Sequence, residues 1–415
     1  MAPSRTLSRR RPDLGALVAP VLAAALFLAG WSALHHGWYA RGEIVDTPVY
    51  ERYGNAIESG QVPYRDFRLE YPPGALPAFA VPALASERGD EKGFRDAFEA
   101  LIALCGAAGA AFVAVALRRL AAGPLPLAGG VAVAALGPLA LGSVVLTRFD
   151  LLPAALTAAA LAALVAGRDR LGFGVLGAAV AVKLSPAVLV PLALVYAWRR
   201  RGRSEALVCF GILAAVVLAA FLPFVALAPD GVAWSLGRQL GRPLQIESLG
   251  SAFLLAAHQA FGLEVTMRSG HGSQNLAGAG PDVLAGVLSA LQLAALASIW
   301  VVFVRGPATP ERLVRYGAAA LVAFVAIGKV LSPQFLIWLL PVVPLVRGRR
   351  GVAASALLLA ACALTQLWFP YRYWDLALDF DAAATWLVLA RDLVLVALLA
   401  VLVLPERRLR RASQG

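Results

Sequence analysis

Two of the three lysines in this 415-residue chain are each followed closely by a Ser-Pro pair. Lys183 begins the sequence Lys-Leu-Ser-Pro and Lys329 begins Lys-Val-Leu-Ser-Pro, whereas the other 34 cations are arginines. An ammonium beside a serine hydroxyl and the N-terminus of a following helix offers several donors to an anion such as a phosphate. Snorkelling of a long lysine side chain toward a membrane surface is the alternative explanation for each lysine.

The sequence Thr-Arg-Phe-Asp at residues 147–150 is a second place where charged groups could act. Ionisable groups at the ends of apolar runs are expensive unless they are paired or functional. Arg148 and Asp150 therefore either form an ion pair within their own turn or contribute to a polar site. The sequence leaves both explanations open.

The composition indicates that lipid surrounds most of the chain. Hydrophobic residues make up 60% and charged residues 15%, with a mean hydropathy of +0.73. Soluble domains are closer to half apolar and a quarter charged, so a soluble enzyme, a disordered chain and a nucleic-acid-binding protein are all disfavoured despite the net charge of +12. The three cysteines lie in apolar runs without a Cys/His cluster, which disfavours a zinc site or a disulfide framework.

Apolar runs alternate with arginine clusters along the whole chain. Because short basic loops stay in the cytoplasm, this alternation predicts an all-α polytopic membrane protein of about twelve helices with both termini cytoplasmic. Proline disfavours helical geometry in the preceding residue, so the long run 171–198 is predicted to form a hairpin that turns at Lys183–Pro186. Apolar runs as short as 333–346 can count among these helices only if they pack inside the bundle. Residues 1–415 then form one integral-membrane domain with a basic cytoplasmic tail at 405–415.

The acids collect on the other side in this arrangement. The segments assigned to the cytoplasm hold 22 of the 37 cations but five of the 25 acids. Two long segments, 35–94 and 229–280, are assigned to the outside, and 35–94 has the composition of a loop with surface helices. We therefore expect the chemistry to lie on the outer side.

Both outer segments mix aromatic and polar side chains. Tyr50, Tyr53 and Ile57 repeat at three and four residues, which predicts an amphipathic helix over 48–59 with an aromatic face suited to the lipid headgroup layer. The second segment resembles a membrane-surface element that faces a polar ligand. Its histidines, His258 and His271, lack a third ligand at metal-binding spacing, and solvated or capping roles are expected for them.

Several different short motifs follow one another along nearly the whole chain. They are Asp46…Tyr50…Gly60…Pro63-Tyr64…Tyr71-Pro72-Pro73, then Arg148-Phe149-Asp150, Lys183…Pro186, Arg242-Pro243-Leu244-Gln245-Ile246-Glu247-Ser248 and Lys329…Ser332-Pro333-Gln334. With these motifs the chain resembles the GT-C superfamily of integral-membrane glycosyltransferases. It is most similar to glycosyltransferase family 87, which includes polyprenyl-phosphate-mannose-dependent mannosyltransferases and related arabinofuranosyltransferases.

This resemblance implies a sugar donor linked through phosphate to a polyprenyl chain. The acceptor would be a glycolipid or cell-envelope glycan at the outer face of a bacterial plasma membrane, and mannose is expected before arabinofuranose. Asp46 matches the family's first-loop aspartate and would be the general base that deprotonates the attacking hydroxyl, with inversion at the anomeric carbon. Glu43, Glu51 and Asp66 compete with Asp46 for this role.

The resemblance also assigns the other site residues. Cations are expected to stabilise the leaving phosphate, and the candidates are Lys183, Lys329, Arg148 and Arg242. Contacts to the substrates are expected from Tyr50, Tyr64, Glu70, Tyr71, Asp150, Gln245, Glu247, His258 and Gln334. Neither of the two large outer segments contains an Asp-x-Asp motif, although Asp379-Phe380-Asp381 lies in the last outer loop. We therefore expect a metal-independent reaction without a cofactor.

Two other classes of protein remain open from the sequence. A transporter or lipid flippase also has about a dozen spans with interrupted helices, but it predicts charged groups near the bilayer midplane. Here the assigned cations lie at one rim. A non-enzymatic scaffold would leave the acidic, aromatic segment 35–94 without a purpose.

Overall fold

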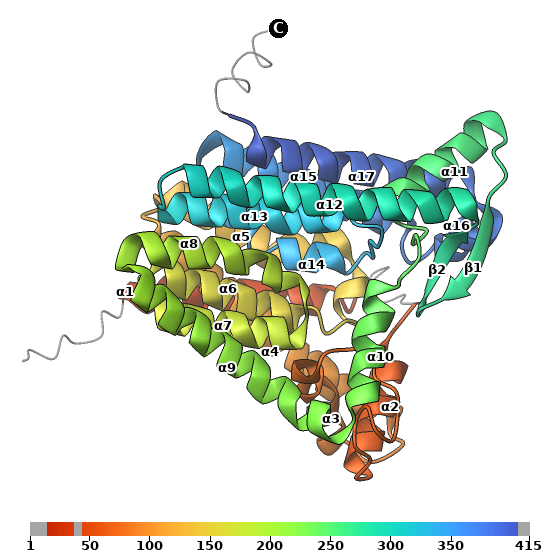
Figure 1. The fold of residues 1–415 in the computed structure, drawn as a ribbon, viewed down its shortest axis with the longest axis horizontal. Coiled ribbons are helices and arrows are strands. Elements are labelled where there is room, and N and C mark those ends of the chain that lie inside the picture. Colours follow the sequence, from red (N-terminus) through yellow and green to blue (C-terminus); the bar gives the residue numbers. More distant parts are fainter. Residues whose placement is uncertain (1–14, 37–43, 406–415) are drawn as a thin grey trace, which may run out of the picture.

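The fold is a bundle of helices with one small β-hairpin at its end (Figure 1). The computed structural model describes residues 15–36 and 44–405. The N-terminal arginines, Glu43 and the tail residues 406–415 lie outside this range. The helices are α1 (Gly15–Ala33), α2 (Thr47–Glu58), α3 (Pro77–Leu84), α4 (Glu91–Arg119), α5 (Pro124–Leu141), α6 (Leu151–Val165), α7 (Asp169–Val182), α8 (Val190–Arg201), α9 (Arg203–Leu227), α10 (Pro229–Leu240), α11 (Leu249–Phe261), α12 (Ala279–Arg305), α13 (Pro310–Ala326), α14 (Phe335–Leu339), α15 (Gly348–Trp368), α16 (Tyr373–Asp379) and α17 (Ala382–Val403).

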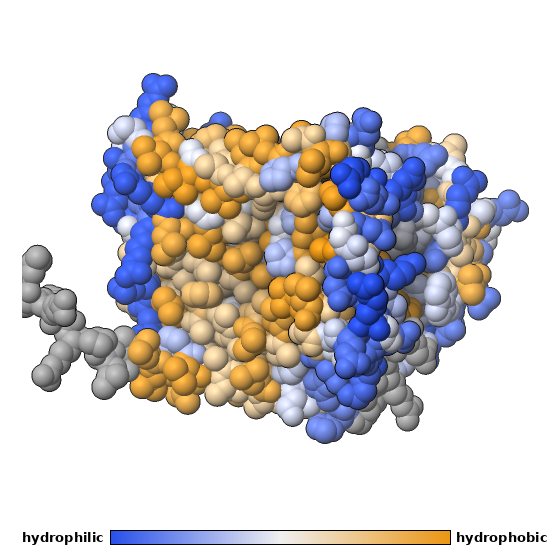
Figure 2. Space-filling view, turned by 90° about the horizontal axis from the view of Figure 1, so that it is seen from below, coloured by the Kyte–Doolittle hydropathy of each residue, from blue (hydrophilic) through white to orange (hydrophobic). Residues whose placement is uncertain are grey.

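On the face of the bundle drawn in Figure 2, an apolar belt lies between two hydrophilic ends. Within the described part of the chain, 6 helices are long and apolar enough to cross a membrane: α4, α5, α9, α12, α15 and α17. Several shorter apolar helices, including α6, accompany them. The multi-pass membrane architecture agrees with the sequence, whereas the expected number of about twelve spans stays a prediction.

The arginine-bearing turns lie together at one end of the bundle, at the left in Figure 1. Arg347, just before α15, donates a hydrogen bond to the carbonyl of Ala121 after α4 at 3.0 Å. Arg199 in α8 donates to the carbonyl of Gly306 after α12 at 2.5 Å. Because these guanidinium groups bind the free carbonyls at neighbouring helix ends, they hold the turns to one another. Further contacts of this kind join Arg315 to Leu402 and Leu404, Arg350 to Leu402, and Arg312 to Val302.

Two predicted features of the chain path can be compared directly with the structure. The predicted break near Lys183 is confirmed, since α7 ends at Val182 and α8 begins at Val190, with a 3-10 turn at Ser185–Leu189 between them. Residues 333–346 do not form one continuous helix. They form α14 and a 3-10 turn at Val343–Leu345, and the side chains along this stretch are mostly buried.

The all-α expectation is wrong for one segment of the second outer region. Residues Thr266–Gly270 (β1) and Ser273–Ala277 (β2) form an antiparallel hairpin. The strand β2 also bonds to the segment before α11, because the Ile246 amide donates to the Gln274 carbonyl at 3.0 Å. This stretch is poor in the β-branched and aromatic residues typical of strands, so local propensity does not reveal the hairpin.

The amphipathic helix predicted over 48–59 is present as α2, but its aromatic face contacts protein. Tyr50 is 1% exposed, and its ring lies 4.9 Å from that of Phe79 and 5.6 Å from that of Phe149. Tyr53 stacks on Phe67 at 5.9 Å. This face is therefore not available to the headgroup layer, and it anchors α2 against the bundle instead.

Candidate active site

Asp46 is held at the start of α2 by a buried arginine. Its Oδ2 atom lies 3.0 Å from Nε of Arg148 and accepts a hydrogen bond from the Tyr50 hydroxyl at 3.2 Å. The Asp46 side chain is 31% exposed, whereas that of Arg148 is 5% exposed. The Asp46 carboxylate is therefore partly open to solvent, while Arg148 and Tyr50 hold its Oδ2 atom in place.

Arg148 is fixed in turn by the chain around it. Its Nη1 donates to the carbonyl and the hydroxyl of Thr147 at 3.2 and 3.1 Å, and its Nη2 donates to the Ile44 carbonyl at 3.5 Å. Arg148 and Asp150 do not pair with each other, because each has a different oppositely charged partner. The explanation of residues 147–150 as a self-contained ion pair is thus wrong.

Asp150 pairs with Lys183 inside an aromatic enclosure. The Lys183 ammonium donates to Asp150 Oδ1 at 2.5 Å, and the Trp338 indole donates to the same oxygen at 2.6 Å. The ammonium also lies 4.9 Å from the ring centre of Phe149 and 4.8 Å from that of Trp338. Its charge is therefore already balanced within the protein.

The polar segment 242–248 meets the second lysine turn. The Gln245 amide nitrogen of the main chain donates to the Lys329 carbonyl at 3.0 Å. The Gln245 side chain donates to the Ser332 hydroxyl at 3.2 Å and also to Glu247 Oε2. Two motifs that are far apart in sequence thus form one buried polar cluster.

Burial raises the pKa of Glu247 from 4.5 to about 7. The neighbouring Arg391, the hydrogen bond from Gln245 and the more distant Arg242 and Arg148 act in the opposite direction. A carboxyl group with a pKa near neutrality can exchange protons or hydrogen bonds with a ligand under ordinary conditions. The charge of Arg148, which pairs with Asp46, is also one of the smaller influences on Glu247, so Arg148 lies near both Asp46 and the 242–248 cluster.

Two cations border this cluster without a carboxylate partner among the described residues. Arg242 donates to the Ser273 hydroxyl at 3.0 Å, and Lys329 donates to the Leu240 carbonyl at 3.0 Å. Burial lowers the pKa of both groups, and the charge of Arg242 lowers the pKa of Lys329 further. A partly buried cation whose charge is disfavoured by a neighbouring cation is a favourable place for an anion.

Three other predicted substrate contacts mainly support the structure. Glu70 accepts a hydrogen bond from Arg238 of α10 at 2.5 Å. The Tyr64 hydroxyl donates to the Tyr71 carbonyl at 2.6 Å. The Tyr71 ring packs against that of Phe149 at 5.0 Å and lies 5.9 Å from the ring of Tyr50.

His258 and Gln334 are not joined to this cluster by any hydrogen bond in the described structure. The His258 ring bonds to the Leu263 carbonyl at 2.7 Å and meets the Phe380 ring edge-on. This contact lies just beyond the end of α11 and is compatible with a capping role, whereas a contact of His258 with substrate stays a prediction. Gln334 precedes α14, where its carbonyl accepts a hydrogen bond from the Ile337 amide at 3.1 Å.

The alternative bases in the first outer segment are placed differently from Asp46. Hydrogen bonds from Arg65 and from the Val62 amide lower the pKa of Asp66 to about 2, which makes it a poor proton acceptor. Glu51 follows Tyr50 on α2 and is exposed only in part. Across residues 15–36 and 44–405, no three His, Cys, Asp or Glu side chains gather in a way that could hold a metal ion.

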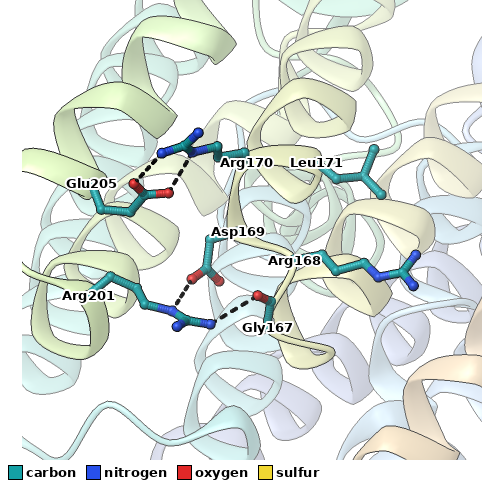
Figure 3. Close-up of a pocket in the computed structure, with 7 residues that line it drawn as sticks. All are labelled: Gly167, Arg168, Asp169, Arg170, Leu171, Arg201 and Glu205. Atoms are coloured by element: carbon teal, nitrogen blue, oxygen red, sulfur yellow. Dashed lines mark hydrogen bonds and ion pairs between the residues drawn. The ribbon is translucent and has the colours of Figure 1, made fainter. Parts of the chain in front are cut away.

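A pocket of about 580 Å³ lies at the opposite, arginine-rich end (Figure 3). Its acids are already paired, since Arg170 binds Glu205 at 2.8 Å and Arg201 binds Asp169 at 3.2 Å. It is formed by the α6–α7 and α8–α9 turns, so it is separate from the Asp46 site. The lining residues are Gly167, Arg168, Asp169, Arg170, Leu171, Arg201 and Glu205.

The sequence alone does not point to three residues that contact the predicted site residues or each other, namely Trp338, Arg391 and Asp392. Trp338 lies in an apolar run, and nothing in the sequence around it indicates that its indole nitrogen donates to Asp150. Arg391 and Asp392 interrupt the apolar helix α17, and adjacent opposite charges inside such a run were an available signal. The side chain of Arg391 reaches the main chain at Glu247.

The comparison with curated proteins gives no match. The crystal structure of ArnT from Cupriavidus metallidurans bound to undecaprenyl phosphate is similar at 15% sequence identity and a TM-score of 0.49, covering 92% of this chain and 76% of ArnT. Residues 69–333, well over half of the chain, match glycosyltransferase family 87. This protein therefore belongs to glycosyltransferase family 87 and is a glycosyltransferase.

Proposed function

We propose that this glycosyltransferase moves a sugar from a polyprenyl-phosphate-linked donor to a glycolipid or cell-envelope glycan. Mannose is the first candidate for the sugar and arabinofuranose the second. The observation that carries the proposal is the arrangement at one end of an apolar bundle. A partly exposed carboxylate, Asp46, lies at the same end as Arg242 and Lys329, two cations that have no carboxylate ion-pair partner among the described residues. A lipid-linked phosphate sugar brings an apolar chain and an anion to the same place.

The orientation of the bundle supports an outward-facing site. Short arginine-rich turns remain on the cytoplasmic side of a membrane. The turns that join α4 to α5 and α8 to α9 are of this kind, and the Asp46 site lies at the other end of the bundle. In this proposal the enzyme acts at the outer face of a bacterial plasma membrane.

Asp46 acts as the general base in the proposed reaction. Its Oδ2 is held by Arg148 and Tyr50, while the described residues give Oδ1 no hydrogen bond. The carboxylate takes the proton of the acceptor hydroxyl as that oxygen forms a bond to the anomeric carbon. The bond from this carbon to the phosphate oxygen breaks on the opposite face, which inverts the configuration and releases polyprenyl monophosphate with the electron pair.

The other polar groups divide between the phosphate and the sugar. Arg242 and Lys329 stabilise the charge that develops on the leaving phosphate. Lys183 supports the site indirectly, because its ammonium is engaged by Asp150. Gln245 and Glu247 face the sugar hydroxyls, for which paired amide and carboxyl groups are suitable partners.

Membership of a glycosyltransferase family decides between the enzyme and the transporter or flippase considered from the sequence. The donor class is tested with purified protein in lipid nanodiscs. Radiolabelled polyprenyl-phosphate-mannose and its arabinofuranose counterpart are each incubated with a cell-envelope glycolipid extract. Labelled glycolipid product is expected from one of the two donors without any membrane gradient. Transfer from a nucleotide sugar alone would overturn the lipid-linked donor.

A further inference from the structure

An ion pair is buried in the middle of the last apolar helix. Arg391 and Asp392 are both 0% exposed, and Nε of Arg391 lies 2.6 Å from Asp392 Oδ1. Arg391 is nine residues into α17, which places it about 14 Å along the helix axis from the start at Ala382. Charged groups at such a depth are costly, and they mark functional or specific structural contacts.

Arg391 connects α17 with the segment that carries Gln245 and Glu247. Its Nη2 donates a hydrogen bond to the Glu247 carbonyl at 2.7 Å. Its guanidinium also lies 5.8 Å from the ring centre of Trp368, at the end of α15. One side chain therefore joins two membrane helices to a segment of the active-site region.

The Glu247 carbonyl needs this contact because of its position in the chain. It precedes Ser248, which caps the N-terminus of α11, and it lies in a buried stretch. A buried carbonyl without a donor is unfavourable. The same segment is held on its other sides by the bonds from Gln245 to the Lys329 carbonyl and from Ile246 to the Gln274 carbonyl.

We propose that Arg391 is a positioning residue of this glycosyltransferase. Its hydrogen bond to the Glu247 carbonyl sets the depth and direction of residues 242–248, and Asp392 neutralises its charge inside the helix bundle. Both residues lie beyond the segment 69–333 that matches the family. The consequence for transfer rests on the proposed function, in which Gln245 and Glu247 contact the sugar.

A paired substitution separates positioning from simple stability. Replacing a buried ion pair with apolar residues of similar size is often neutral or stabilising, whereas removing one partner leaves an uncompensated charge. The double variant Arg391→Met/Asp392→Leu therefore folds as the wild type does, but it leaves the Glu247 carbonyl without its donor. Thermal unfolding in nanodiscs checks that the fold is retained.

Hydrogen exchange gives a readout that does not depend on the substrate. The amides of Gln245, Ile246 and Ser248 are hydrogen-bonded, so loosening of the segment accelerates their exchange. We expect peptides covering 244–252 to exchange about tenfold faster in the double variant, because local opening becomes easier. The matched control is Arg350→Met, which removes a guanidinium bonded to the Leu402 carbonyl at 3.2 Å near the other end of α17. It leaves exchange over 244–252 unchanged.

Transfer kinetics test the catalytic consequence. A small misplacement of groups that orient a substrate can lower the rate about 100-fold. We expect a loss of this order in kcat for the double variant, a smaller change in KM for the lipid donor, and near wild-type kinetics for Arg350→Met.

The pH profile distinguishes positioning from packing. Glu247 faces Arg391 from α17, Arg242 from its own segment, Arg148 from the turn before α6 and Tyr373 from α16. Loss of the Arg391 charge moves the Glu247-dependent limb of the profile to higher pH. Arg391→Lys, which keeps the charge but not the planar donor geometry, restores the position of this limb without restoring kcat.

The proposal and the proposed function fail in different ways. Wild-type exchange over 244–252 in the double variant would overturn the positioning role, whatever the substrate is. Faster exchange with unchanged kcat would overturn its importance for transfer. If the wild-type protein uses neither polyprenyl-phosphate sugar, the proposed donor is wrong, and the exchange comparison still decides whether Arg391 positions the segment.

Discussion

Arg148 and Asp46 form an ion pair, 3.0 Å from Nε to Oδ2, between the turn before α6 and the start of α2. The cation is buried and tied to Thr147 and Ile44, whereas the carboxylate remains accessible. This difference in burial fixes the position of the carboxylate without covering it. A general base needs both properties, because it must be aimed and must also meet its substrate.

Asp46→Asn is expected to lower sugar transfer by about 10²–10⁴-fold. Asparagine has nearly the same shape and can still bond to Arg148 and Tyr50, but it cannot accept the proton, and general base catalysis contributes about 10²–10⁴-fold. The measurement is turnover of the purified variant with the labelled donor. Asp66→Asn is the matched control, since Asp66 is another acid of the same outer segment and pairs with Arg65 at the surface. Equal losses in the two variants would contradict the assignment.

Lys183→Met is expected to destabilise the protein by about 3–5 kcal/mol, because it leaves Asp150 charged and unpaired in the interior. Asp150 is 1% exposed. Adding Asp150→Asn removes that charge, and the double variant should regain most of the stability and transfer to within about tenfold of the wild type, a difference of about 1.4 kcal/mol. Thermal unfolding and turnover are measured on both proteins. Recovered stability with transfer still absent would show that Lys183 acts directly on the donor.

Arg242→Met and Lys329→Met are each expected to raise KM for the lipid donor about tenfold, the effect of losing one charge-assisted contact. The acceptor KM should change less, because the contact is to the donor phosphate. Arg65→Met is the control, since Arg65 is an exposed cation of the outer region that pairs with Asp66. An effect on the acceptor KM alone would place the two cations at the other substrate.

Stability is expected to fall as the pH rises through neutrality because of Glu247. Burial raises the pKa of this carboxyl group from 4.5 to about 7, so its contribution is fully present below about 4.5 and is lost as the pH rises through about 7. The difference corresponds to about 3 kcal/mol. Unfolding of the wild type and of Glu247→Gln is compared between pH 4.5 and pH 8. The variant should be the more stable of the two at pH 8, and a constant difference across this range would contradict the prediction.

The sequence was informative where local chemistry sets the structure. The proline after Ser185 predicted the break between α7 and α8, and the spacing of Tyr50, Tyr53 and Ile57 predicted α2. The arginine clusters predicted which turns share an end of the bundle. These features depend on residues close together in the chain, for which steric and periodic rules are sufficient.

Long-range pairing could not be predicted in the same way. Nothing near Asp150 shows that its partners are Lys183 and the indole of Trp338. The β-hairpin also depends on distant residues, because β2 bonds to the segment before α11. For the same reason the sequence alone predicts that the aromatic face of α2 contacts lipid headgroups, although its neighbours are rings from α3 and the turn before α6.

The guanidinium contacts at the arginine-rich end of the bundle, which we propose to be cytoplasmic, give a physical reason for the preference for arginine over lysine. Either cation satisfies the charge rule for topology. A guanidinium also has a planar fork of donors, so Arg315 bonds to the carbonyls of Leu402 and Leu404 at once. An ammonium is a compact charge that would hold such diverging carbonyls less well. The preference for arginine thus reflects the need to hold neighbouring helix ends together. Replacing these arginines with lysine would keep the charge but weaken the contacts between the helix ends.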